Sequence, residues 1–103
     1  FTPSALDGAW VVDIEPAADD RGFFARTYCE NEFAAQGLTT SWVQSNVSFN
    51  AARHTLRGMH YQRPPHGEPK LVRVTAGAIH DVIVDLRPDS PTDMSYEGFE
   101  LSA

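Results

Sequence analysis

The chain has 103 residues, of which 42% are hydrophobic and 21% charged, a composition typical of one soluble domain that excludes wholesale disorder. Its formal charge of −6 argues against nucleic acid or a membrane surface as a partner, because both attract basic proteins. The single cysteine, Cys29, excludes an internal disulfide, and no apolar run is long enough to span a membrane, so we expect a cytoplasmic protein.

Proline and glycine interrupt the chain at short intervals, and the apolar residues between them mostly alternate or cluster in short runs. This pattern predicts seven strands, at residues 10–14, 22–28, 41–49, 56–62, 70–75, 78–86 and 98–102. It also predicts one short helix over residues 30–36, ended by Gly37. Turns are predicted at residues 17–21, 50–54, 63–69, 76–77 and 88–93. We therefore expect an all-β fold, a double-sheet sandwich or jelly roll, as a single domain over residues 1–103, with another type of barrel as the competitor.

Polar side chains alternate along the predicted strand at residues 41–49. Period-two alternation places Gln44 and Asn46 on one face, together with Trp42 and Ser48. Two amides that project together suit the binding of hydroxyls or phosphate oxygens. The alternative is a solvent-exposed face of an edge strand.

The predicted strand at residues 56–62 contains Arg57, Gly58 and His60, which interrupt its apolar pattern. Strict alternation would put Arg57 and His60 on opposite faces, but a bulge at Gly58 would turn both toward one cavity. His60 then becomes a candidate general base, since histidine can exchange a proton near neutral pH. The alternative is a structural histidine held by a hydrogen bond.

Two further cations stand at turns. Lys70 follows the predicted turn at residues 63–69, and Arg21 lies in an Asp-Asp-Arg-Gly turn. With Arg57 they would supply positive charge for a diphosphate, and Lys70 could also polarise a carbonyl or stabilise an enolate. Each could alternatively be only a surface charge.

A metal site is not expected, although His60, His66 and Glu68 lie close in sequence. Metal-binding cupins place two histidines as His-x-His on one strand, and here Gln62, a poor ligand, occupies the second position.

Two carboxylates, Asp81 and Asp85, share one face of the predicted strand at residues 78–86. They could serve acid–base chemistry, but we favour structural roles, either paired with Arg73 or Arg87 or exposed to solvent.

Several segments match one known pattern in order and spacing. They are Arg21-Gly-Phe-Phe24, Gln44-Ser-Asn46-Val-Ser48, Leu56-Arg-Gly-Met-His-Tyr-Gln62, Lys70-Leu-Val72 and Asp81-Val-Ile-Val-Asp-Leu-Arg87 with Ser90-Pro-Thr92. Together they closely resemble the dTDP-4-dehydrorhamnose 3,5-epimerase family, from about Asp19 to the end of the chain. The resemblance implies a cupin-type jelly roll, usually a homodimer, that uses neither a metal nor an organic cofactor. It also implies a dTDP-4-keto-6-deoxyhexose substrate, epimerised at C3, C5 or both through an enolate.

The resemblance assigns a role to each candidate residue. His60 matches the catalytic base and Lys70 the residue beside the developing enolate oxygen, while Arg57 matches a residue of the sugar pocket. The nucleotide diphosphate is assigned to Arg21, Gln44 and Asn46.

Two departures from the family pattern stand out. Arg26 occupies a position where the family usually has glutamate. Family members also extend further, and the tyrosine proton donor and the aspartate that pairs with the histidine lie in that further part. We therefore expect this chain to be the N-terminal portion of a larger cupin domain. The alternatives are a non-catalytic sugar-nucleotide binding or dimerisation module, a 3- or 5-specific epimerase, and a metal-dependent cupin.

Overall fold

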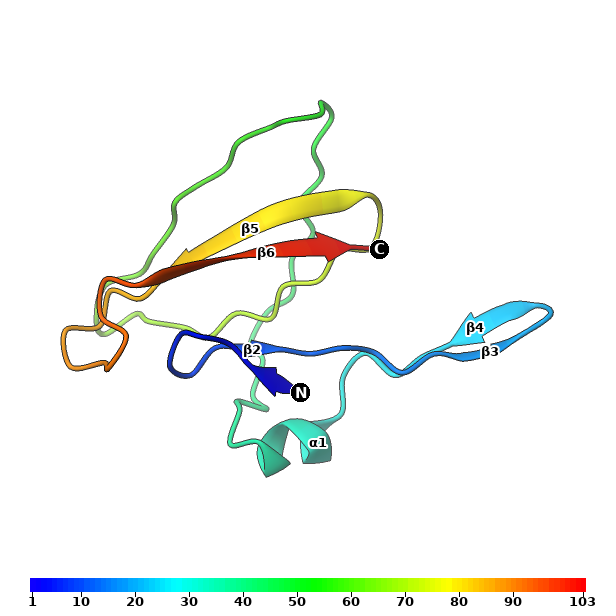
Figure 1. Cartoon of the computed structure of the whole chain (residues 1–103), viewed down its shortest axis with the longest axis horizontal. Coiled ribbons are helices and arrows are strands. Elements are labelled where there is room, and N and C mark those ends of the chain that lie inside the picture. Colours follow the sequence, from blue (N-terminus) through cyan, green and yellow to red (C-terminus); the bar gives the residue numbers. More distant parts are fainter. The chain divides into compact units, whose positions relative to one another are not determined.

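The computed structural model describes residues 1–103 and contains short strands with one short helix (Figure 1). The elements are β1 (Thr2–Pro3), β2 (Trp10–Val11), β3 (Ala17–Asp19), β4 (Gly22–Phe24), α1 (Glu30–Ala35), β5 (Ala78–Val84) and β6 (Tyr96–Ser102). The strands pair as three antiparallel hairpins, β1–β2, β3–β4 and β5–β6. No helix is long and apolar enough to cross a membrane. The all-β prediction is confirmed.

The chain divides into two compact units, which are described separately. The first comprises Phe1–Cys29 and Val72–Ala103 and contains every strand, whereas the second, Glu30–Leu71, contains α1. The predicted single domain over residues 1–103 stays a prediction.

The β5–β6 hairpin is the longest ladder of the first unit. Its register runs from Ala78 opposite Ser102 to Val84 opposite Tyr96. On β6 the half-buried side chains alternate, at Glu97, Phe99 and Leu101, as in a hairpin strand with one covered face. On β5, Ile79 and every residue from Asp81 to Val84 are half-buried, so the second half of β5 is partly covered on both faces.

Four predicted strands are confirmed with changed limits. Residues 10–14 contain β2, residues 22–28 begin with β4, residues 78–86 begin with β5, and residues 98–102 lie within β6. The predicted turn at residues 17–21 was too long, because Ala17–Asp19 pairs with β4 as β3. Asp19 lies opposite Gly22, so the turn contains only Asp20 and Arg21, and Gly22 has a φ of 134° that favours glycine.

The predicted strands at residues 41–49, 56–62 and 70–75 were wrong, because these segments form no strands in the structure. Their alternation indicates side chains compatible with a strand, but a strand also needs a partner for its backbone N–H and C=O groups. Neither unit provides one, and Val43, Val47 and Leu56 are 90%, 93% and 92% exposed.

In the second unit, Phe33 is the buried residue of α1, with 3% of its surface exposed. The helix ends at Ala35, one residue before the predicted limit, and Gly37 caps it as predicted, with a φ of 69° in the left-handed region. The amide of Leu38 donates to the carbonyl of Phe33 at 3.0 Å and that of Gly37 to Ala34 at 2.9 Å, which closes the last turn in a Schellman motif.

We expect Gly37→Ala to destabilise this helix end by about 1 kcal/mol, because alanine disfavours a positive φ. Urea unfolding followed by circular dichroism measures the change. Gly67→Ala is the matched control, since Gly67 has no positive φ and open space around its Cα. An equal loss in both variants would contradict the prediction.

Candidate functional site

The six predicted site residues lie in both units, and all six are exposed. Arg21 belongs to the first unit. The second unit contains Gln44, Asn46, Arg57, His60 and Lys70. The predicted polar face on residues 41–49 is therefore solvent-exposed at Gln44 and Asn46, as the edge-strand alternative required, although no strand forms.

Arg21 stands at the tip of the β3–β4 hairpin and is bound by Asp19. Its backbone amide donates to Asp19 Oδ1 at 2.9 Å, and its Nε donates to Asp19 Oδ2 at 3.1 Å. Arg21 Nη2 also donates to Asp19 Oδ2. The side-chain hydrogen bonds raise the pKa of Arg21 and lower the pKa of Asp19. The turn thus presents a guanidinium whose orientation is fixed by a carboxylate two residues before it.

Arg57 connects two segments of the second unit. Its Nε donates to Asn50 Oδ1 at 2.6 Å, and its Nη2 donates to the carbonyl oxygen of Phe49 at 3.1 Å. The guanidinium therefore points back to the end of the segment at residues 41–49.

Gly58 lies between Arg57 and His60 and has a φ of 105°, which a residue with a side chain would adopt only under strain. A Cβ atom there would lie 3.4 Å from His60 Nδ1. The prediction of a β-bulge at Gly58 was wrong, because the segment has no paired strand in which a bulge could form. Glycine nevertheless provides the unusual backbone conformation and leaves room for the imidazole ring.

Lys70 forms hydrogen bonds with residues at both ends of the predicted turn at residues 63–69. Its Nζ donates to Glu68 Oε1 at 2.6 Å and to Gln62 Oε1 at 3.4 Å. The hydrogen bond from Lys70 lowers the pKa of Glu68, and the charge of the ammonium adds to this effect. Glu68 is thus engaged by Lys70, and with His60 and His66 it forms no cluster of potential metal ligands.

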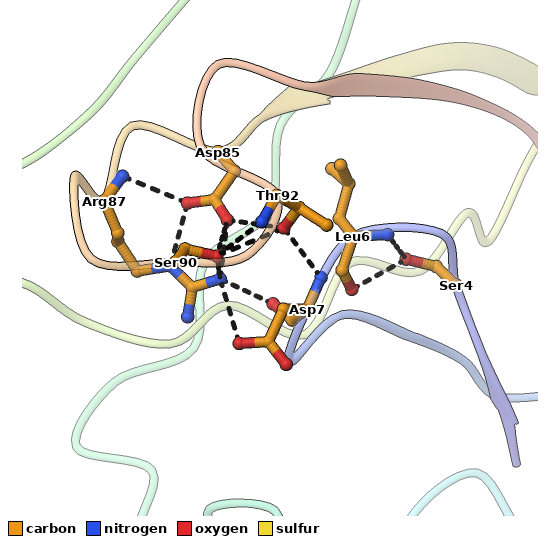
Figure 2. A network of polar contacts seen from close by, with 7 residues as sticks. All are labelled: Ser4, Leu6, Asp7, Asp85, Arg87, Ser90 and Thr92. Carbon is orange, nitrogen blue, oxygen red and sulfur yellow. Dashed lines mark hydrogen bonds and ion pairs between the residues drawn. The ribbon is translucent and has the colours of Figure 1, made fainter.

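The most extensive polar network centres on Asp85, which is 6% exposed (Figure 2). Oδ1 accepts from Arg87 N at 3.0 Å and Arg87 Nε at 2.8 Å. Oδ2 accepts from Arg87 Nη2 at 2.8 Å, Ser90 Oγ at 2.5 Å and Thr92 Oγ1 at 2.8 Å. These donors, Arg87 first and then Ser90, hold the pKa of Asp85 well below its usual range, although burial alone would raise it.

The predicted pairing of Asp85 with Arg87 is confirmed. Ser90 and Thr92 belong to the Ser90-Pro-Thr92 segment of the family pattern, but sequence analysis did not predict that their hydroxyls bind Asp85. Hydroxyl side chains in turns commonly form such local hydrogen bonds, so the presence of a serine and a threonine in the predicted turn at residues 88–93 could have indicated these contacts.

Residues 3–103 match the protein family described as dTDP-4-dehydrorhamnose 3,5-epimerase. The chain belongs to that family. This confirms the resemblance found in the sequence motifs, and the match includes all six candidate residues.

Three members of this epimerase family illustrate the similarity. The dTDP-4-dehydrorhamnose 3,5-epimerase of Methanothermobacter thermautotrophicus is 45% identical over 103 residues, which cover 99% of this chain and 54% of the relative. The crystal structure of the Bacillus anthracis enzyme, with TDP and PPi bound, is 47% identical, has a TM-score of 0.84, and is matched over 88% of this chain and 52% of its own. The Elizabethkingia anophelis enzyme is 36% identical with a TM-score of 0.92, and the match covers 99% of this chain and 56% of its own.

This chain therefore spans about half the length of the epimerases that it matches. The structural similarity at these identities also confirms the predicted cupin-type fold class.

We expect Asp85 to make stability depend on pH in the acid range. A carboxyl whose pKa is lowered in the folded state stabilises that state above its ordinary pKa of about 4, and this stabilisation disappears as pH falls below that value. Asp85→Asn should therefore lower the urea midpoint at pH 7, and its difference from the unmodified protein should shrink between about pH 5 and pH 2.

The matched control is Asp89→Asn, which changes an exposed aspartate of the same turn that is not among the hydrogen-bond partners of Asp85. A pH-independent difference between Asp85→Asn and the unmodified protein would refute the assignment.

Proposed function

We propose that this chain acts in a dTDP-4-dehydrorhamnose 3,5-epimerase, which inverts C3, C5 or both in a dTDP-4-keto-6-deoxyhexose. The observation that carries the proposal is the family match over residues 3–103, which includes His60 and Lys70. The TDP in the Bacillus anthracis structure supports a dTDP-linked substrate. We place the reaction in the cytoplasm, as the single cysteine suggests.

His60 is proposed as the general base. The 4-keto group acidifies the hydrogens on C3 and C5, because the electron pair left by either C–H bond can delocalise onto the ketone oxygen. The imidazole takes the proton and an enolate forms. A separate acid group then delivers a different proton to the opposite face of the carbon, which inverts it. His60 is exposed, and Gly58 leaves space beside its ring. Positioned acid–base groups of this kind contribute about 10²–10⁴-fold to a rate.

Lys70 is proposed to stabilise the enolate oxygen. A lysine ammonium has three N–H donors, and Glu68 and Gln62 are the acceptors that it contacts here. One donor therefore remains for the substrate, while the two contacts limit where the ammonium can move. A fixed positive charge is most effective at an atom that becomes negative only during the reaction.

The remaining candidates are proposed to bind the substrate outside the reacting carbons. Arg57 would contact the sugar, and Arg21, Gln44 and Asn46 would contact the nucleotide diphosphate. Two guanidinium groups and two exposed amides offer the donors that phosphate and hydroxyl oxygens require.

We further propose that the protein is a homodimer and that the β3–β4 hairpin forms part of the interface. Phe23 and Phe24 on β4 are 68% and 79% exposed, and the hairpin contacts no other strand or helix. Adjacent exposed aromatic side chains are typical of interaction surfaces.

Solvent deuterium incorporation tests the catalytic assignment. We expect the protein to incorporate deuterium at C3 and C5 of the 4-keto sugar, and we expect His60→Ala to slow this by at least about a hundredfold. His66→Ala, a second exposed histidine in the same unit, should leave the rate unchanged. Equal rates in His60→Ala and the unmodified protein would exclude His60 as the base.

The same measurement separates the alternatives. Exchange at one carbon indicates a 3- or 5-specific epimerase, and tight dTDP binding without exchange indicates a non-catalytic module. Exchange that requires a stoichiometric metal ion indicates a metal-dependent cupin.

Sedimentation velocity tests the interface. We expect the unmodified protein to sediment as a dimer and the double variant Phe23→Ser/Phe24→Ser to sediment as a monomer at micromolar concentration. Tyr96→Ser is the matched control, because Tyr96 is 76% exposed but lies on β6. A double variant that remains dimeric would show that the dimer forms elsewhere.

A further inference from the structure

The loop between β1 and β2, residues 4–9, lies against the turn that joins β5 to β6, and we name it the N-terminal loop (Figure 2). The amide of Asp7 donates to Thr92 Oγ1 at 3.0 Å, and the amide of Ala5 donates to Glu97 Oε2 at 2.9 Å. Arg87 Nη2 donates to the carbonyl oxygen of Asp7 at 2.6 Å. Side chains of the turn region thus satisfy backbone groups of the loop.

The hairpin that carries this loop has little support of its own. β1 and β2 are two residues each, paired as Thr2 with Val11 and Pro3 with Trp10. Isolated hairpins are marginal in water even with longer strands. Inside the loop, Ser4 N donates to the carbonyl of Ala9 at 2.9 Å, and Leu6 N donates to Ser4 Oγ at 3.0 Å. The order of the hairpin therefore depends largely on its docking, and Leu6 in the loop is 4% exposed.

The hydrogen bonds of the Asp85 side chain go to Arg87, Ser90 and Thr92 rather than to the loop, and two of these partners, Arg87 and Thr92, hold Asp7. The Thr92 hydroxyl has one hydrogen, which it donates to Asp85 Oδ2, so its oxygen faces the Asp7 amide as an acceptor. Arg87 Nη2 has two hydrogens, and its acceptors include Asp85 Oδ2 and the Asp7 carbonyl oxygen. Nη2 of the Arg87 guanidinium also lies 3.7 Å from Asp7 Oδ2, which makes an ion pair with the loop. The carboxylate thus orients both groups.

We propose that the N-terminal loop is a latch that Asp85 closes indirectly, through Arg87 and Thr92. When either side chain loses its orientation, the β1–β2 hairpin detaches as one unit while the β5–β6 ladder stays paired. Asp85 is a positioning residue in this device. Local opening of this kind is governed by few contacts, and here the contacts on Asp7 come from two side chains that share one acceptor.

Amide hydrogen exchange measured by NMR on the full protein tests the latch. Thr92→Val keeps the shape of the side chain but removes its hydroxyl, and Asp85→Asn removes the charge that orients it. In both variants we expect the amides of Ser4, Asp7 and Ala9 to exchange at least about tenfold faster. The amides within β5, residues 79–83, should keep their rates in Thr92→Val, and in Asp85→Asn, which also lowers global stability, they should accelerate less than the loop amides.

Two matched controls isolate the contacts. Thr92→Ser retains the hydroxyl and should retain slow exchange at Asp7. Asp89→Asn changes the charge of an exposed residue of the same turn that is not among the hydrogen-bond partners of Asp85, and it should leave exchange in the loop unchanged. The proposal also requires that Asp85→Asn add little to the double variant Arg87→Lys/Thr92→Val, because residues that act through one another are not additive.

Three results would overturn the latch. They are unchanged exchange at Asp7 in Thr92→Val, equal acceleration in the loop and in β5, and a full additional effect of Asp85→Asn in the double variant. Thr92→Val alone decides the first two if Asp85→Asn does not fold.

Discussion

One buried carboxylate organises the first unit, because the loop that closes β5–β6 is built around Asp85. Burying an ionised group is costly unless donors replace the water that it loses. Asp85 accepts five hydrogen bonds, from Arg87, Ser90 and Thr92. All three partners follow it closely in sequence, so the charge and its donors are brought together by a single turn rather than by distant parts of the chain.

Local features of the fold could be predicted from the sequence. Gly37 caps α1 because a left-handed residue is needed there, and the run of apolar residues with alternating polar ones at residues 78–86 correctly predicted a strand, β5. The failures, at residues 41–49, 56–62 and 70–75, share one physical cause. Alternation of apolar and polar residues can be read from one segment, but a strand forms only when the backbone of that segment pairs with a second one. The residue pattern of a segment does not show whether such a partner is present.

In the candidate site, too, local sequence features could be predicted, whereas contacts between segments could not. Residue types and motif order identified the family, and the family match bears this out. Side-chain partners were harder to predict, because Arg57 with Asn50 and Lys70 with Glu68 depend on the paths of irregular segments. Asp85 with Arg87 was predictable, since both belong to one motif and opposite charges two residues apart can meet where a strand ends.

The pairing of Arg21 with Asp19 has a consequence for ligand selection. An anion that approaches the tip of the β3–β4 hairpin meets a guanidinium already occupied by a carboxylate of single charge. To bind there, the anion must outcompete an internal rival that is tethered at high effective concentration. A diphosphate has more charge and more acceptor oxygens than that rival, whereas a monovalent anion does not. In the proposed role of Arg21 as a diphosphate-binding residue, Asp19 would therefore favour anions of higher charge.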